Sequence, residues 1–236
     1  MVFLRSLLFT LVMLVITPPY SLFALATAPL PPQARWRAIS GWSRIVMWMA
    51  RAVLGLRYRV EGLQHLPRQP AVILSKHQSA WETIAFQRIF PPHVHVLKRE
   101  LLWIPFFGWG LALMSPIAID RGRGIRALKR MAEKGAERFA QGFWILIFPE
   151  GTRMQAGAHG KYHVGGAWVA SRLGAPVVPV AHNAGLYWAK NAFLKYPGEI
   201  TVQIGEPIPT AGSSPEAVTA KAEEWIEARC AALCRA

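Results

Sequence analysis

Acidic residues are scarce in this 236-residue chain. Thirteen Asp and Glu stand against 27 Lys and Arg, which gives a formal net charge of +14 and excludes a charge-balanced surface. Such an excess predicts a polyanionic partner, either nucleic acid or an anionic bilayer. The hydrophobic fraction of 53% and the ten Trp residues favour the bilayer, because Trp collects at the membrane interface.

Cysteine is rarer still, with two residues placed four positions apart near the C-terminus. One such pair excludes a disulfide framework, and the sequence contains no zinc-binding spacing. His93 with His95 and His159 with His163 have spacings that suit a metal, but neither pair has an acidic or cysteine partner around it. We therefore expect no metal site and no bound cofactor.

Charge is missing altogether between positions 6 and 34. About 20 apolar residues cross the ~30 Å of hydrocarbon in a bilayer, so this stretch is long enough to span or embed. Pro18 and Pro19 interrupt it, and we expect them to kink or break the helix. The alternative is a cleaved signal peptide, with Arg5 as its charged start and residues 26–28 as its cleavage site. The apolar run that continues past residue 16 favours a membrane anchor.

A second helix is predicted over residues 35–56. Arg37, Arg44 and Arg51 recur every seventh residue and therefore share one face of it. A basic helix that carries Trp is typical of a membrane interface, although an ordinary surface helix has the same pattern. Six arginines between positions 35 and 59 predict that this side faces the cytoplasm. We expect a bacterial inner-membrane protein in which residues 1–55 form the membrane anchor and residues 56–236 the cytoplasmic main domain.

From residue 56 onward, short β-branched runs alternate with longer helical patterns. This alternation predicts an α/β fold, with a mixed, largely parallel sheet flanked by helices. Residues 101–114 are apolar almost throughout and predict either a buried helix or the wall of an apolar channel. The predicted strands are residues 58–60, 71–74, 94–97, 116–120, 144–148, 177–181 and 200–204, and the predicted helices are residues 81–89, 125–141, 166–173 and 215–233.

A histidine and an acid follow the predicted strand 71–74, at the carboxyl edge where α/β sheets place their sites. A hydroxyl is a poor nucleophile near neutral pH, and a histidine is the side chain best suited to take its proton. A carboxylate on the other ring nitrogen would fix the tautomer and stabilise the imidazolium. His77 and Glu82 are therefore predicted to be a general base and its orienting acid, although a lone histidine is often structural.

Residues 148–153 end the most apolar predicted strand in a polar turn. Arg153 offers a planar fork that suits phosphate, and Gly151 lets a ligand approach the backbone closely. Glu150 would orient Arg153 or bind the acceptor, and Thr152 lies between them in the same turn. Arg121, at the end of the strand 116–120, is a second phosphate ligand in this interpretation. The alternative is a surface turn with an ion pair. Residues 177–183 predict an acyl-pocket wall or plain core.

In this order, the four blocks resemble the glycerolipid acyltransferase family, most closely its 1-acylglycerol-3-phosphate (lysophosphatidic acid) acyltransferases. The resemblance covers residues 58–207 and the apolar N-terminus. It implies an α/β acyltransferase fold, a His-x4-Asp catalytic pair, an acyl-CoA or acyl-carrier-protein donor, a lysophospholipid acceptor and a phosphatidic acid product. It maps His77 onto the catalytic base. The residues that it maps onto acceptor binding are Arg121, Glu150, Gly151, Thr152 and Arg153.

Two residues around His77 depart from the family pattern. Glu82 stands where most members have Asp, so the orienting role requires the turn to accommodate one more methylene. Lys76 replaces the frequent Asn before the histidine. These departures leave open another lyso-lipid acceptor, such as a lyso-ornithine lipid.

Two other classes of protein compete with an acyltransferase. A lipid esterase lacks support because the sequence has no G-x-S-x-G nucleophile elbow. A basic protein that binds membranes or nucleic acid without catalysis would account for the charge. The aromatic residues crowd the apolar N-terminus, however, and not a basic sheet face, so we expect an anionic membrane as partner and no nucleic acid.

Overall fold

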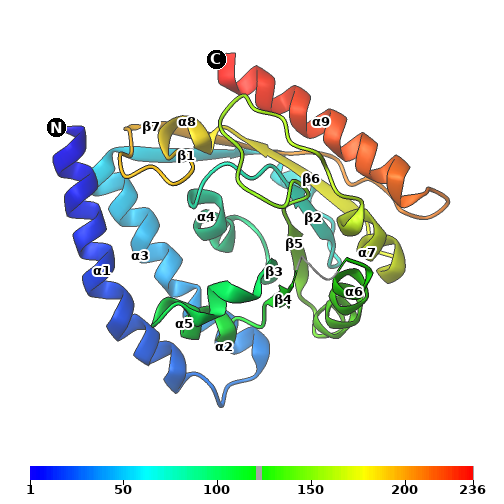
Figure 1. The fold of residues 1–236 in the computed structure, drawn as a ribbon, viewed down its shortest axis with the longest axis horizontal. Coiled ribbons are helices and arrows are strands. Elements are labelled where there is room, and N and C mark those ends of the chain that lie inside the picture. The colour runs from blue at the N-terminus through cyan, green and yellow to red at the C-terminus, as the bar shows by residue number, and fades with distance from the viewer. Residues whose placement is uncertain (121–123, 236) are drawn as a thin grey trace.

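The computed structural model describes residues 1–120 and 124–235, and one seven-stranded sheet forms its centre (Figure 1). The strand order is β1-β7-β6-β2-β5-β3-β4, and the neighbouring pairs are parallel except β6 with β7. The predicted mixed, largely parallel sheet is confirmed. The strands are β1 (Leu56–Glu61), β2 (Val72–Ser75), β3 (His93–Lys98), β4 (Ile117–Ile119), β5 (Trp144–Ile147), β6 (Val177–His182) and β7 (Gly198–Ile204).

The three central strands are buried along their whole length. Every residue of β2, β5 and β6 is buried, because helices cover both faces of the sheet. Successive side chains of β2 enter opposite layers, with Val72 and Leu74 in one core cluster and Ile73 in the other. All seven predicted strands are confirmed, with small differences at their ends, because such apolar β-branched runs leave little choice of structure.

Helices form one layer on each side of the sheet (Figure 1). The helices α6, α7 and α9 pack on one face, and α4 packs on the other together with the N-terminal helical residues Phe9 and Val46. The four helices predicted after residue 56 are confirmed. The main-domain helices are α4 (Trp81–Ile89), α5 (Phe107–Leu113), α6 (Ile125–Ala140), α7 (Gly165–Leu173), α8 (Ala184–Tyr187) and α9 (Pro215–Arg235), with short 3-10 turns η2 (Leu63–His65) and η3 (Arg99–Trp103).

The N-terminal segment forms a long helix and two shorter ones. α1 (Val2–Ala26) runs without interruption through Pro18 and Pro19, so of the predicted kink or break the break is wrong. Packing against the main domain holds the helix on both sides of the prolines, which outweighs the two missing backbone donors. The predicted helix over residues 35–56 is divided into α2 (Pro32–Ile39), α3 (Gly41–Met49) and a π-helical turn η1 (Ala50–Leu54).

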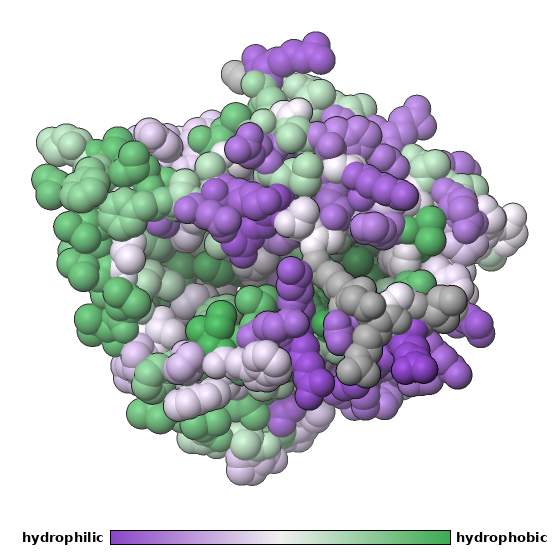
Figure 2. Space-filling model, in the orientation of Figure 1, coloured by the Kyte–Doolittle hydropathy of each residue, from purple (hydrophilic) through white to green (hydrophobic). Residues whose placement is uncertain are grey.

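One face of α1 is fixed to the main domain near its start. The backbone N–H of Lys195 donates to the hydroxyl of Ser6 at 2.9 Å, and the ring of Phe9 meets Trp188 edge-on with centroids 5.4 Å apart. The ammonium of Lys195 lies over both rings, 5.8 Å from the centroid of Phe9 and 5.0 Å from that of Trp188. Burial lowers the pKa of Lys195. The other face of α1 exposes large apolar side chains, which gather on one side of the molecule (Figure 2).

We expect Phe9→Ala to lower the free energy of unfolding by roughly 3–5 kcal/mol, because it empties a buried aromatic site between α1 and the domain. The neighbouring Leu8, which is 52% exposed, provides the matched control. Leu8→Ala should change stability by less than about 0.5 kcal/mol. Chemical unfolding in detergent micelles measures both variants. Equal effects would mean that α1 does not depend on this contact for its docking.

Candidate active site

The loop between β2 and α4 brings His77 and Glu82 together. His77 Nδ1 lies 2.8 Å from Glu82 Oε1. The same oxygen accepts hydrogen bonds from the backbone N–H groups of Gln78 at 2.9 Å and Ser79 at 2.8 Å. Glu82 is the second residue of α4, so its side chain folds back over the start of its own helix as a capping carboxylate does. The longer side chain therefore reaches the imidazole from this turn.

The carboxylate of Glu82 is completely buried. Burial would raise its pKa, but interactions with His182, with His77 and with the N–H of Ser79 outweigh burial and lower the pKa below its ordinary value. Glu82 is therefore ionised at neutral pH. An ionised carboxylate on Nδ1 places the proton of a neutral imidazole on that nitrogen and leaves Nε2 as the free base.

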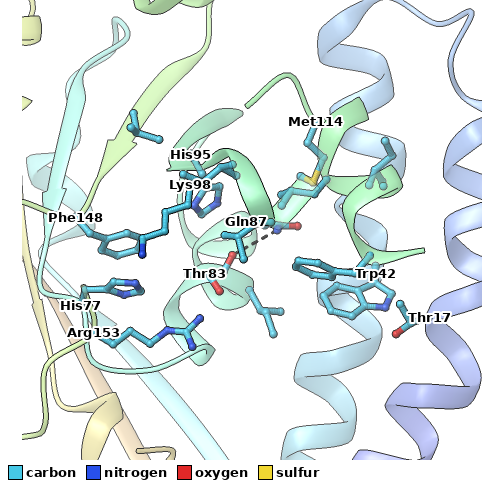
Figure 3. A pocket seen from close by; sticks show the side chains of 18 of the residues that line it. Thr17, Trp42, His77, Thr83, Gln87, His95, Lys98, Met114, Phe148 and Arg153 are labelled. Atoms are coloured by element: carbon cyan, nitrogen blue, oxygen red, sulfur yellow. Dashed lines mark hydrogen bonds between the residues drawn. The ribbon is translucent and has the colours of Figure 1, made fainter. Parts of the chain in front are cut away.

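Phe148 fixes the plane of the His77 ring from one side. The two rings are stacked with centroids 3.9 Å apart and an angle of 14° between their planes (Figure 3). Phe148 follows β5 directly and is itself buried. The stacking and the bond to Glu82 together restrict the imidazole to one orientation. The His77 side chain is 15% exposed and lines a cavity, so the ring remains accessible to a substrate.

This cavity has a volume of about 410 Å³ and lies between the sheet edge, α4, α5 and the N-terminal helices. Figure 2 shows the molecule hollowed in this region, and Figure 3 shows the lining side chains. The segment 101–114 contributes to the wall as η3 and α5. Of the two predicted alternatives, a buried helix or a channel wall, the channel wall is confirmed. Residues 177–183 lie in the core at and just after β6. The apolar lining comes from Ala24, Ile39, Trp42, Ile84, Val96, Leu97, Leu101, Phe107, Leu111 and Met114.

Cationic side chains line the same cavity beside His77. Arg153 points into it, and the guanidinium Nε of Arg153 is buried without a hydrogen-bond partner among residues 1–120 and 124–235 (Figure 3). Lys98, at the end of β3, and Lys190 line it as well. The sequence alone does not single out these two lysines, because their approach to His77 depends on strand order. Arg121, the other predicted phosphate ligand, lies outside the described residues.

The turn after β5 divides its residues between the cavity and the protein interior. Gly151 and Thr152 line the cavity, and Gly151 has a φ of 68°, which side chains disfavour. Glu150 is buried, with one oxygen 2.7 Å from Lys76 Nζ and the other accepting the backbone N–H of His77 at 3.2 Å. Its role in acceptor binding stays a prediction, but these contacts favour a role in holding the loop.

Comparisons with known proteins show a similarity that includes the residues of this site. Residues 57–183, more than half of the chain, match the family model described as "Acyltransferase". The chain belongs to this acyltransferase family. A 1-acyl-sn-glycerol-3-phosphate acyltransferase of Pseudomonas aeruginosa is 50% identical over 201 residues, which are 84% of this chain and 78% of the relative.

Two more distant relatives show how far the similarity extends. The 1-acyl-sn-glycerol-3-phosphate acyltransferase alpha of Mus musculus is 31% identical over 184 residues, 76% of this chain and 65% of that protein. The crystal structure of the 1-acyl-sn-glycerophosphate (LPA) acyltransferase PlsC from Thermotoga maritima has a TM-score of 0.82 at 24% identity, over 98% of this chain and 95% of the other. The second comparison shows a shared fold.

Three other histidines of this acyltransferase differ from His77 in burial or in partner, although His95 lines the same cavity. His93 is buried with a pKa lowered by burial to about 4, and burial also holds the pKa of His95 well below its ordinary value, so both are neutral. His159 pairs with Glu223 on the surface. Within residues 1–120 and 124–235, no three His, Cys, Asp or Glu side chains gather in a way that could hold a metal ion.

We expect Glu82→Gln to lower kcat by about a hundredfold, within the 10²–10⁴-fold that general-base catalysis typically supplies. The glutamine oxygen can still accept from the two backbone donors, so the fold should persist while the charge on the imidazole is lost. Glu82→Asp withdraws the carboxylate by one methylene from three donors arranged for glutamate, so its kcat should also fall. The fall should be smaller than for Glu82→Gln, because aspartate keeps the charge.

The measurement is kcat for both variants, with His77→Ala as the reference for a missing base and circular dichroism as the test of folding. A folded Glu82→Gln enzyme with the wild-type kcat would show that the charge is dispensable. The pair would then not be the catalytic base and its support.

Proposed function

We propose that this acyltransferase is a 1-acylglycerol-3-phosphate O-acyltransferase. It would transfer a fatty acyl group from acyl-CoA or acyl-carrier protein to the free hydroxyl of lysophosphatidic acid, giving phosphatidic acid. The observation that carries the proposal is the position of His77, which shares one cavity with three cationic side chains and an extended apolar wall. The relative from Pseudomonas aeruginosa supports the same activity by its name and its 50% identity.

The reaction follows from the orientation of the imidazole. Nδ1 is held by Glu82, so Nε2 takes the proton of the acceptor hydroxyl as its oxygen attacks the thioester carbonyl carbon. The new C–O ester bond forms, and the tetrahedral intermediate collapses with cleavage of the C–S bond. The leaving thiolate takes the proton back from Nε2 and departs as a thiol. Glu82 stabilises the imidazolium between these two transfers and keeps its own charge.

The polar side of the cavity suits the phosphate of the acceptor. Among the residues that the structure describes, the buried Nε of Arg153 has no hydrogen-bond partner, and a planar guanidinium fork of this kind binds phosphate through paired hydrogen bonds. Lys98 and Lys190 add positive charge on the same cavity. The apolar side suits a hydrocarbon chain, and about 410 Å³ lies within the range of known small-molecule sites.

The partner on the outside is proposed to be an anionic membrane surface. α1 is long and apolar enough to cross a membrane, as judged by length and composition. Because α1 also packs along the main domain, we propose that it embeds in one leaflet, with residues 1–55 as the anchor. Trp48 and Trp103 are each 68% exposed, and Arg37, Arg44 and Arg51 are exposed on the N-terminal helices. The inner membrane, with the active site on its cytoplasmic side, is the proposed location.

We expect Arg153→Ala to raise the KM for lysophosphatidic acid by about ten- to a hundredfold, because a charge-assisted bond contributes roughly 1.5–3 kcal/mol. The donor KM should stay within about threefold of wild type, since the thioester does not carry this phosphate. Arg172→Ala, which removes an arginine that lies over Trp168 on α7, is the matched control.

Products are identified by mass spectrometry with a mixed acyl-CoA pool and three acceptors: lysophosphatidic acid, lysophosphatidylcholine and a lyso-ornithine lipid. Phosphatidic acid should dominate for the wild type. Equal or faster acylation of the lyso-ornithine lipid, or an unchanged acceptor KM in Arg153→Ala, would contradict the proposed acceptor.

We expect Trp48→Glu to weaken binding to anionic vesicles by about tenfold, which corresponds to ~1.4 kcal/mol, because it puts a charge where an aromatic ring meets the interface. Leu63 is 50% exposed on η2, away from the N-terminal helices, so Leu63→Glu is the matched control. Vesicle co-sedimentation measures both variants. If the two substitutions have equal effects, α3 is not part of the membrane-binding surface.

A further inference from the structure

Lys76, the residue directly before His77, is a buried cation with a full set of partners. Its side chain is 1% exposed. The ammonium donates to Glu150 Oε1 at 2.7 Å, to Glu227 Oε1 at 2.7 Å and to the backbone carbonyl of Ala158 at 2.9 Å. Three donors thus meet three acceptors from the turn after β5, from α9 and from the loop before α7. Removing one partner from such a buried ion pair strongly destabilises the fold, because an uncompensated charge remains in the interior.

The cluster holds two negative charges around one positive charge. Burial would lower the pKa of Lys76, but its bonds to Glu150 and Glu227 outweigh burial and raise it. Tyr162 donates its hydroxyl to the same Glu227 oxygen at 2.7 Å, and burial raises the pKa of this phenol far above neutral pH. The ammonium and the phenol therefore both donate to Glu227, which ties α9 to the loop around His77.

The same cluster holds the backbone of His77. Glu150 uses its second oxygen to accept the N–H of His77 at 3.2 Å. The carbonyl of Lys76 lies 2.9 Å from His182 Nε2, and the carbonyl of His77 accepts the N–H of Met154 at 2.7 Å. The peptide groups on both sides of His77 are thus fixed by side chains and backbone outside the loop. Movement of Glu150 would shift the imidazole relative to Glu82 and Phe148.

We propose that α9 is a positioning element of the active site, acting on His77 through the chain of contacts Glu227–Lys76–Glu150. α9 lies outside residues 57–183, the part that matches the family model. Lys76 also departs from the asparagine that is frequent at this position in the family, and Glu227 is the partner that accompanies this departure. Glu227 and Lys76 do not line the cavity. They act through the orientation of His77, and the proposal rests on the proposed function for the role of His77 as the base and for the acceptor used in the assay.

Glu227→Gln tests the link from α9, because glutamine keeps the size and one acceptor oxygen but removes the charge. Its kcat should fall about tenfold, while KM for donor and acceptor stays within about twofold, since the base is misplaced and the binding groups are not. Glu223→Gln is the matched control, because Glu223 lies one turn earlier on α9 and pairs with His159 at the surface. Its kcat should stay within about twofold of wild type.

A second pair of variants tests the charge balance at Lys76. Lys76→Asn leaves Glu150 and Glu227 without their shared cation, so kcat should fall about a hundredfold, the loss that a displacement of ~1 Å can cause. Adding Glu227→Gln removes the excess charge, so the double variant should recover at least about tenfold in kcat over Lys76→Asn. Thermal unfolding and circular dichroism determine the folded fraction, to which each kcat is normalised.

Three results would overturn the proposal. One is a Glu227→Gln enzyme whose kcat equals that of Glu223→Gln. Another is a double variant no more active than folded Lys76→Asn. The third is a loss of stability with unchanged kcat per folded enzyme, because it indicates a structural role alone. If Lys76→Asn does not fold, the comparison of Glu227→Gln with Glu223→Gln decides. Wild-type turnover with lysophosphatidic acid is measured first, so a wrong acceptor is recognised separately.

Discussion

The site depends on one oxygen atom, Oε1 of Glu82, which serves an imidazole and two backbone amides at once. A carboxylate with no exposed surface is stable as an ion only if donors converge on it. Here all three donors belong to the loop that carries His77 and leads into the helix that carries Glu82. The burial that makes the carboxylate dependent on its partners therefore also determines where the imidazole of His77 lies. Folding the β2–α4 loop and bringing His77 to Glu82 are one event.

The cavity requires both parts of the chain. The main domain contributes His77, Arg153 and Lys98 at the carboxyl ends of parallel strands, where α/β sheets place their sites. The N-terminal helices contribute Tyr20 and Trp42, so a main domain without them would leave the apolar wall open. The contact between Phe9 and Trp188 consequently matters for the shape of a site to which neither ring belongs. In the proposed function, the same segment attaches the protein to the membrane and forms part of the acyl-binding wall.

Local patterns predicted the strands, the four later helices and the neighbourhood of His77 with Glu82, because each follows from apolar periodicity or short spacing. The sequence patterns failed where contacts between residues far apart in the chain determine the structure. Pro18 and Pro19 predicted a kink or a break, yet packing on either side keeps α1 continuous. Lys98 lies in the cavity because β3 neighbours β5, an order that composition does not contain. Lys76 appeared as a departure from a family pattern, and its partner Glu227 lies 151 positions away.

The sequence of α1 explains why hydrophobic periodicity did not reveal the cavity. Toward the cavity it presents Thr17, Tyr20, Ser21 and Ala24, and toward the outside it presents apolar residues such as Leu14 and Leu22. Neither face carries a charged side chain among these residues, so both are compatible with a hydrocarbon environment. An amphipathic pattern arises only when one face meets water. In the proposed function, α1 lies between a bilayer and an acyl-binding cavity and meets apolar surroundings on both sides, so its sequence resembles that of a simple membrane span. Only its packing against the catalytic domain distinguishes the two.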